Sequence, residues 1–308
     1  MQKRVALPEG EQRLHWRVSL IVGAVSLASA LVIILLGWWA MSTVDHGAQE
    51  REVSFAQQGL QDIYARIPTE QESSVIWSEA VERVKAHDQL WMTSNLGEWM
   101  GSYFGFNQVF VLNERNAAVH AMENGNTLPA ETAYDDERAA IEPLVVELRR
   151  QISAATAGLD DSTEAIGEIG IQDFIILNGA PAIVSIKPII PDTDALTQRP
   201  GSEYLHIAVR FLDDSFVNEI AEKYQLTNAR IAPQGENAPE SSIPIANASG
   251  ETLAYFFWDP YRPGLSMVEK LGRRLPLPPF QSPHFCFGWC DICGCQPNGS
   301  VIWPFMTH

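Results

Sequence analysis

Cysteine is absent from the first 285 residues, and all four cysteines lie near the C-terminus, as Cys286, Cys290, Cys293 and Cys295. The body of the protein therefore has neither a disulfide nor a thiol site, and its core depends on packing alone. Basic runs longer than two residues are also absent, and the formal net charge is −17. An acidic chain of this kind does not follow a phosphate backbone, which argues against nucleic acid as a partner.

Common catalytic and cofactor motifs are missing as well. The chain has no phosphate-binding glycine loop, no HExxH and no G-x-S-x-G elbow. The seven histidines stand singly, without a metal-ligand spacing. We therefore expect no cofactor and no enzyme activity in this chain.

One long apolar run is present. Residues 18–41 carry no charge, and as a helix these 24 residues would rise about 36 Å, enough to cross a hydrocarbon core of about 30 Å. Trp38 and Trp39 close the run where interfacial aromatic residues belong, whereas a cleaved signal peptide would have a shorter apolar core and a small-residue cleavage site. We therefore predict a single membrane-spanning helix.

Charges flank this run unequally. Four basic residues precede it (Lys3, Arg4, Arg13 and Arg17), and three acidic residues follow it (Asp45, Glu50 and Glu52). Because basic flanks stay in the cytoplasm, we expect residues 1–17 inside and everything after residue 41 outside.

An apolar stripe continues beyond the span, at Val53, Ala56, Leu60, Ile63 and Ile67. Its steps of three and four residues predict a helix that stops at Pro68. Two interpretations stay open. The stripe is either the seam of a parallel homodimer that carries a signal into the membrane, or the inner face of an amphipathic helix that lies on the sheet of its own domain.

A second helix is expected after a polar turn, capped by Ser73 or Ser74. Its apolar face has helical spacing and consists of Trp77, Val81, Val84 and Trp91. Asp88 falls on the same face, where a carboxylate needs a hydrogen-bond partner. It either grips a cationic group of a ligand or, as we favour, anchors the helix to a nearby loop.

Short strand signals dominate the rest of the chain. They predict one hairpin over residues 106–122 with its turn at 114–116, a second hairpin over 174–190 around Asn178-Gly179, and strands at 204–213 and 251–258. Helices are expected at 137–156, in its later turns only because of Pro143, and at 214–224, with Phe216 and Ile220 inward; residues 155–167 and 234–242 should be loops. Long helices followed by a mostly antiparallel sheet indicate an α+β domain.

Two cations lie on predicted strands. Lys187 and Arg210 either line a cleft for an anionic small molecule or form structural ion pairs with the acidic surface.

A series of residues, in a recognisable order and spacing, points to a known family of domains. It includes Trp77, Asp88, Trp91, Asn95, Gly97, Trp99, Phe104-Gly105 and Gln108–Leu112, and later Pro181-Ala182, Pro188-Ile189, Phe211-Leu212-Asp213, Gly250 and Trp258-x-Pro260-x-x-Pro263-Gly264. Over residues 42–268 the chain resembles the fourth class of CHASE extracytoplasmic sensory domains. The resemblance implies a Cache-like or PAS-like fold, a periplasmic location at the bacterial inner membrane, and attachment through a second membrane helix to cytoplasmic GGDEF, EAL or histidine-kinase domains. It names no ligand. The candidate contacts for an unknown small molecule are Asp88, Trp91, Asn95, Trp99, Lys187 and Arg210.

Residues 269–308 depart from that pattern. They are rich in proline and cysteine and cannot span a membrane. Reading the codons one frame over turns Trp303 to His308 into Ala, an apolar residue, Tyr or His, Asp, a small residue and Leu, which is similar to the A-F-H-D-x-L start of GGDEF domains. We therefore interpret this stretch as an out-of-frame tail.

The function expected from these observations is a membrane-anchored periplasmic sensory module, the truncated input half of a cyclic di-GMP signalling protein. The alternative is a metal-binding periplasmic protein that uses Cys286, Cys290, Cys293 and Cys295. A third hypothesis is a standalone binding protein that partners another receptor.

Overall fold

A computed structural model describes residues 9–161, 163–193, 196–233 and 241–274. The chain divides into two units at Met267, within the last helix. The helices are α1 (Glu9–Val75), α2 (Ser78–Lys85), α3 (Gln89–Met92), the π-helix η1 (Thr93–Glu98), α4 (Trp99–Phe104), α5 (Ala130–Ala155), α6 (Thr163–Ile166), α7 (Asp214–Tyr224) and α8 (Pro263–Arg274). The strands are β1 (Gln108–Leu112), β2 (Ala118–Glu123), β3 (Asn126–Thr127), β4 (Ile171–Leu177), β5 (Ala180–Ile189), β6 (Tyr204–Phe211), β7 (Thr227–Pro233), β8 (Ser242–Ala246) and β9 (Thr252–Asp259).

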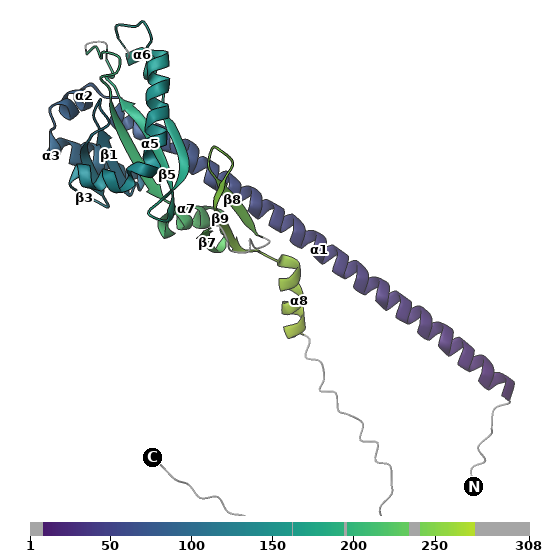
Figure 1. Cartoon of the computed structure of the whole chain (residues 1–308). Coiled ribbons are helices and arrows are strands. Elements are labelled where there is room, and N and C mark those ends of the chain that lie inside the picture. The colour runs from purple at the N-terminus through teal and green to yellow at the C-terminus, as the bar shows by residue number, and fades with distance from the viewer. Residues whose placement is uncertain (1–8, 162, 194–195, 234–240, 275–308) are drawn as a thin grey trace, which may run out of the picture. The chain divides into compact units, whose positions relative to one another are not determined.

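An antiparallel sheet of six strands, in the order β3-β2-β1-β6-β5-β4, forms the centre of the domain (Figure 1). Its central strands β1, β5 and β6 are buried almost throughout, so both faces of the sheet are covered. One face packs on α5 through a core that includes Phe110, Val184 and Leu148. The other face packs on α1 and α7 through a core that includes Ile183, Ile67 and Phe216. The α+β class and both hairpins expected from the sequence are confirmed.

A second antiparallel sheet, β7-β9-β8, packs on the same side as α1 and α7. Only β9 was expected from the sequence. β7 was missed, and β8 begins at Ser242, where a loop was expected to end; residues 234–240 of that expected loop lie outside the described residues. β7 is mostly exposed or half-buried, with Ala232 buried, so it lacks the continuous apolar signal of β5 and β6.

The prediction that α1 stops at Pro68 is wrong, because the helix runs on to Val75. A proline lacks the N–H that would bond the carbonyl four residues earlier, here that of Tyr64. Gln172 of β4 replaces it, since its side-chain N–H donates to the Tyr64 carbonyl at 3.0 Å, while the Tyr64 hydroxyl donates to the Gln172 carbonyl at 3.0 Å. A tertiary hydrogen bond thus satisfies the Tyr64 carbonyl, which the proline leaves without its helical donor.

The apolar stripe on α1 takes the second of its two expected roles. Ala56, Ile63 and Ile67 are buried in the core beneath the sheet, and Val53 and Leu60 pack against that core half-buried. A homodimer formed through these five residues stays a prediction that a single chain does not test.

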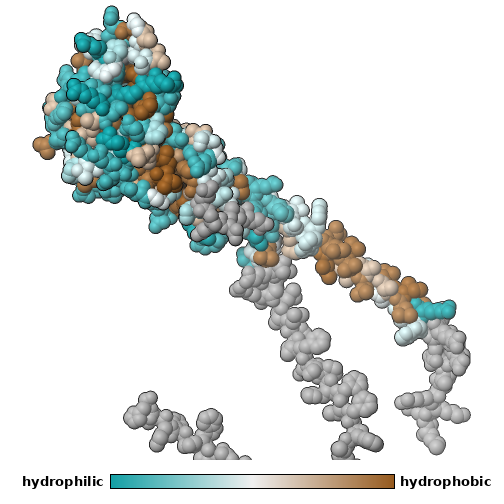
Figure 2. Space-filling view, in the orientation of Figure 1, coloured by the Kyte–Doolittle hydropathy of each residue, from teal (hydrophilic) through white to brown (hydrophobic). Residues whose placement is uncertain are grey.

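Earlier on α1, residues 18–40 are exposed on all sides. α1 is the one helix in the described chain that is long and apolar enough to cross a membrane, and the most apolar part of it has none of its residues buried. Figure 2 shows this stretch as brown surface.

The second helix starts later than expected. Ser73 and Ser74 belong to the last turns of α1, and α2 begins at Ser78, with Trp77 as its N-cap. The break between α1 and α2 is fixed by the end of β5, because Ile190 donates to the Val75 carbonyl at 2.9 Å and accepts from the Trp77 amide at 2.9 Å. Ser73 and Ser74 therefore cap nothing.

Three further boundaries differ from expectation. α5 begins at Ala130 and continues through Pro143, because its buried residues Tyr134, Ile141 and Val145 form one stripe across that proline. α6 lies within the loop expected at 155–167. α8 continues to Arg274, so residues 269–274 are helical rather than irregular, and the four cysteines lie outside the described residues. α7 has the predicted bounds, with Phe216 and Ile220 buried.

Candidate functional site

The segment between α2 and β1 changes helical form several times. His87, at φ 55°, ends the turn after α2, and Asp88 caps α3. The helix then widens into the π-helix η1 and continues as α4 until Gly105, at φ 75°. π-helical turns are rare and concentrate at functional sites, so this segment marks a candidate site.

A cleft of about 580 Å³ opens beside this segment. One wall consists of η1 and α4, through Gly97, Glu98, Gly101, Ser102 and Gly105. The opposite wall comes from β2 with its turn into β3, from the start of β1 and from the first turn of α7, and includes Asn107, Met122, Asn124, Gly125 and Ser215. This volume is in the range of small-molecule sites.

A glycine stands where the two walls meet. A Cβ on Gly97 would lie 2.1 Å from the sulfur of Met122, so a larger residue here would have to displace the Met122 side chain. Gly97, Gly101 and Gly105 are spaced four residues apart and leave one side of the helical segment without side chains, which exposes backbone to the cleft.

The polar groups of the cleft are mostly neutral. Glu98 is the one charged side chain among the described residues that line it. The side chains of Glu98, Ser102 and Ser215 make no hydrogen bond or ion pair to any part of the chain that the structure describes. A carboxylate and two hydroxyls favour a small hydrogen-bonding molecule that is neutral or cationic.

None of the six residues predicted as ligand contacts is among those that line this cleft. Asp88 accepts from the Trp91 amide at 3.1 Å and from Arg83 at 3.0 Å, so it is a helix cap held by an ion pair. The Trp91 ring packs on Trp77 with 5.1 Å between ring centroids, and Asn95 donates to the Trp91 carbonyl at 2.9 Å.

The other three predicted contacts also have partners inside the domain. The Trp99 ring packs against the exposed ring of Tyr103, with 4.0 Å between the ring centroids. Lys187 is buried and pairs with Glu72 of α1. Arg210 is buried behind the cleft, with a guanidinium nitrogen 3.6 Å from where a Cβ of Gly105 would lie. Ligand contact by any of the six stays a prediction.

Sequence reasoning missed Glu98, Ser102 and Ser215. The available signal was the four-residue glycine spacing from Gly97 to Gly105, which is unusual inside a helical segment. A second cavity, of about 710 Å³, is lined by Asp161, Thr163 and Asp192 among others.

Buried polar side chains connect η1 to α1 beneath this site. The His206 ring on β6 faces the Leu96 carbonyl of η1 at 3.3 Å through Nε2 and Gln71 of α1 at 2.8 Å through Nδ1. The Gln71 amide oxygen accepts from the hydroxyl of Ser185 at 2.7 Å. Since Leu96 offers only an acceptor and the Gln71 amide nitrogen only a donor, the His206 proton belongs on Nε2.

Burial lowers the pKa of His206 to about 4, and the nearby His120 adds to this effect although the bond to Leu96 opposes it. Burial alone lowers the pKa of His120 to about 4. Both rings are therefore neutral at pH 7.

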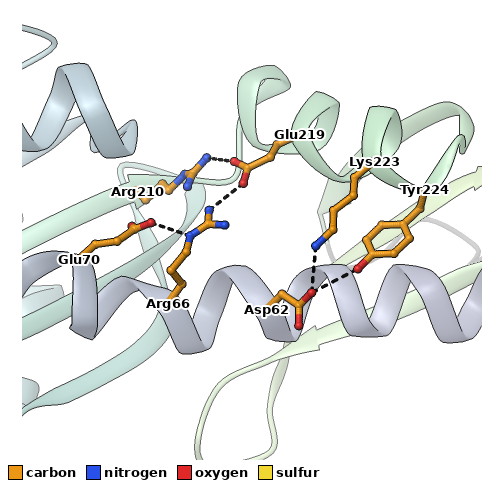
Figure 3. A network of polar contacts seen from close by, with 7 residues as sticks. All are labelled: Asp62, Arg66, Glu70, Arg210, Glu219, Lys223 and Tyr224. Atoms are coloured by element: carbon orange, nitrogen blue, oxygen red, sulfur yellow. Dashed lines mark hydrogen bonds and ion pairs between the residues drawn. The ribbon is translucent and has the colours of Figure 1, made fainter.

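A second polar network, on the surface, joins α1 to α7 and β6 (Figure 3). Arg66 lies between Glu70 at 2.5 Å and Glu219 at 2.8 Å, and Glu219 also accepts from Arg210 at 2.5 Å. Asp62 accepts from Lys223 at 3.0 Å and Tyr224 at 3.2 Å.

The titration of this network follows its geometry. Burial pushes the pKa of Glu219 up, but the bonds from Arg66 and Arg210 outweigh it and hold the pKa below its usual value. Burial dominates at Glu70 and raises its pKa despite Arg66. Glu219 is thus the firmly ionised centre of the network.

The family model of the CHASE4 domain matches residues 60–232, more than half of the chain. The chain belongs to the CHASE4 domain family. CHASE domains are extracytoplasmic sensory domains, so this CHASE4 domain is an extracytoplasmic sensory module, and it follows a helix able to cross a membrane.

Among curated proteins, none matches this CHASE4 chain. Two solved structures are similar to it at low identity. The crystal structure of the periplasmic domain of Vibrio cholerae LuxQ has a TM-score of 0.39 and 10% identity, and the match covers 69% of this chain and 100% of that one. The sensor domain of the V. cholerae histidine kinase DctB has a TM-score of 0.34 and 11% identity, covering 61% of this chain and 62% of that one. At these scores neither likeness bears on the ligand of this CHASE4 domain.

In the part of the CHASE4 chain that the structure describes, no group of three or more His, Cys, Asp or Glu side chains has the arrangement of a metal site. The four cysteines of the metal-binding alternative are not among the described residues.

Proposed function

We propose that this CHASE4 domain binds a small neutral or cationic molecule in the cleft beside η1 and passes its occupancy through α1 to the membrane. The observation that carries the proposal is the position of the cleft. It lies against the one segment with π-helical geometry among the described residues, and that segment is bonded through His206 to α1. A ligand that repositions η1 therefore acts on the helix that runs on into the apolar residues 18–41.

The direct test is a thermal-shift screen of the full chain in detergent against small neutral and cationic molecules. A binder at one hundred times its Kd stabilises the folded state by about 2.7 kcal/mol. Ser102→Trp fills the cleft and should abolish the shift, whereas Tyr103→Trp, one residue away and outside the cleft, should retain it. A compound that stabilises both variants equally binds elsewhere and contradicts the proposal.

We propose that the domain faces the periplasm of a bacterial inner-membrane protein with its N-terminus in the cytoplasm. The support is the charge difference across the apolar run, with Arg13 and Arg17 before it and Glu50 and Glu52 after it. Alkaline phosphatase fused after Trp258 should be active, and green fluorescent protein at the same place should be dark. The reverse pattern would invert the orientation.

We further propose that the output of the intact protein makes or degrades cyclic di-GMP in the cytoplasm. The support is the sequence beyond residue 268, which acquires a GGDEF-like start when read one frame over. Nucleotide sequence for about a kilobase downstream should hold a cyclase-like or phosphodiesterase-like frame. Its absence would remove the cyclic di-GMP part and leave the sensory part standing.

A further inference from the structure

Helix α7 touches the cleft at its first turn. Ser215, its second residue, lines the cleft. Asp213, its N-cap, accepts from the Phe216 amide at 3.1 Å and from the side chain of Asn107 at 3.2 Å. Asn107 also lines the cleft and accepts from the Phe211 amide at 2.8 Å. The start of α7 is thus bonded to the cleft wall.

The later turns of α7 lie against α1. A Cβ on Gly59 of α1 would meet Tyr224 at 2.7 Å and Ile220 at 2.9 Å, so the two helices touch where α1 has no side chain. Asp62 and Arg66, on the same face of α1, hold α7 through the network of Figure 3. This contact combines close packing with charged hydrogen bonds.

Arg210 provides a second connection from the cleft wall to α1. Arg210 lies directly behind Gly105 of the cleft wall and bonds Glu219, which also bonds Arg66 of α1. Phe216, Val217 and Ile220 are buried in the core that α7 shares with α1. A packed core does not deform continuously, so a shift of the first turn of α7 has to be taken up at α1.

We propose that α7 is a second element, beside the His206 link, that transmits occupancy of the cleft to α1, with Glu219 as the positioning residue that joins the two. The proposal rests on the cleft being the sensory site and specifies how that site is read. Transmission runs from Ser215, along an 11-residue helix, to Gly59, Asp62 and Arg66.

An artificial occupant tests this without a known ligand. In a full chain whose four native cysteines are replaced by serine, Ser102→Cys places a thiol in the cleft, where a bulky maleimide can be attached. Hydrogen exchange is then measured on the α1 amides of residues 55–70, in detergent. The matched control is Tyr103→Cys with the same label, since Tyr103 is on the same helix, is exposed and does not line the cleft.

The expected result is about a tenfold change in exchange over residues 55–70 on labelling the Ser102→Cys variant, and no change on labelling the Tyr103→Cys variant. Glu219→Gln should reduce the response, because it weakens the link from Arg210 to Arg66 while the packing of α7 on Gly59 stays. If this variant does not fold, Gly59→Ala forces α7 away from α1, and Gly47→Ala, with nothing within 4 Å, is its control.

Two outcomes would overturn the proposal: no response of α1 to the label, or an equal response with and without the two uncoupling substitutions. Failure of the sensory proposal has a different signature. In that case no molecule in the thermal-shift screen binds the cleft, while the label still acts on α1 through α7.

Discussion

The two stretches of α1 show how one continuous helix meets two different surroundings. Residues 18–41 are apolar on every side and almost entirely exposed, with Leu31 58% exposed, whereas residues 53–75 are apolar on one side, with Ile67 0% exposed. The first stretch has no charge, and the second has charged residues on its other faces, among them Asp62, Arg66 and Glu70.

The difference lies in the period of the apolar residues rather than in their number. A stripe with helical period finds its partner within the folded chain, as Ala56, Ile63 and Ile67 do. A helix that is apolar all round needs an apolar solvent, which the chain itself does not provide. Each stretch should therefore respond in its own way to the same kind of substitution.

The largest expected effect comes from charging the first stretch. Arginine near the centre of a membrane-spanning helix costs about 2.5–3.5 kcal/mol. The double change Leu27→Arg and Leu31→Arg should therefore release the chain from the carbonate-resistant membrane fraction. Val44→Arg, also at an exposed position but beyond the run, should stay in that fraction.

Retention of the double variant in the membrane would show that residues 18–41 are not the anchor. A mature protein whose N-terminal sequence starts beyond residue 41 would show a cleaved signal peptide instead. Either result would contradict the interpretation of residues 18–41 as a membrane anchor.

In the second stretch, truncation should act on the fold instead. Ile67→Ala removes a fully buried side chain and should cost about 2–5 kcal/mol of unfolding free energy, measured by denaturation of the full chain in detergent. Leu31→Ala removes a comparable side chain from the exposed stretch and should leave the unfolding of the domain unchanged. Equal losses in the two variants would mean that both stretches pack in the same core.

How much of the fold the sequence predicts depends on whether the signal is local. β5 and β6 are buried on both faces, so their apolar runs are continuous and both strands were predicted. The part of α1 beyond Pro68 was not predicted. The side-chain N–H that bonds the open Tyr64 carbonyl belongs to Gln172, more than one hundred residues away. Propensity alone says that a proline ends a helix, and one tertiary hydrogen bond reverses that outcome.

The site was less predictable for a related reason. Asp88, Lys187 and Arg210 drew attention as charges in apolar surroundings, and each has a partner in the domain. The cleft is marked by what is missing, namely the side chains of Gly97, Gly101 and Gly105. Its walls come from η1, α4, β1, β2 with its turn into β3, and α7, and no spacing in the sequence brings these together.

The buried ring of His206, which bonds Gln71 near the end of α1, should make the stability of the domain depend on pH. His206 is neutral in the fold, with a pKa of about 4, but takes up a proton near pH 6.5 when unfolded. The unfolded state therefore binds more protons between about pH 4 and 6.5, and stability falls as pH decreases through that window. From pH 7 to pH 5 this loss is about 2 kcal/mol.

His206→Gln keeps a donor for Leu96 and an acceptor for Gln71 but does not titrate. The difference between wild type and this variant isolates His206, because other groups, such as Glu70, titrate in both. Wild type should lose about 2 kcal/mol more than the variant between pH 7 and pH 5. Parallel pH profiles would mean that His206 is not buried as a neutral ring.

The smallest effect is expected at the junction of the two stretches, just past residue 41. Two carboxylates of α1 hold the end of the domain there. Glu52 accepts from the Trp258 indole at 3.1 Å and from the Tyr261 amide at 3.1 Å, and Asp45 accepts from the Gly264 amide at 2.6 Å. A Cβ on Gly264 would lie 2.9 Å from the Met41 carbonyl, so the chain after β9 lies directly against the first turn beyond the apolar run.

Glu52→Gln weakens two charge-assisted hydrogen bonds without removing the side chain, and should cost about 1 kcal/mol. The expected readout is about fivefold faster hydrogen exchange over residues 258–264, with little change in the rest of the domain. Glu50→Gln changes an exposed carboxylate two residues away and is the matched control. If both variants exchange alike, the carboxylate of Glu52 does not hold the end of the domain.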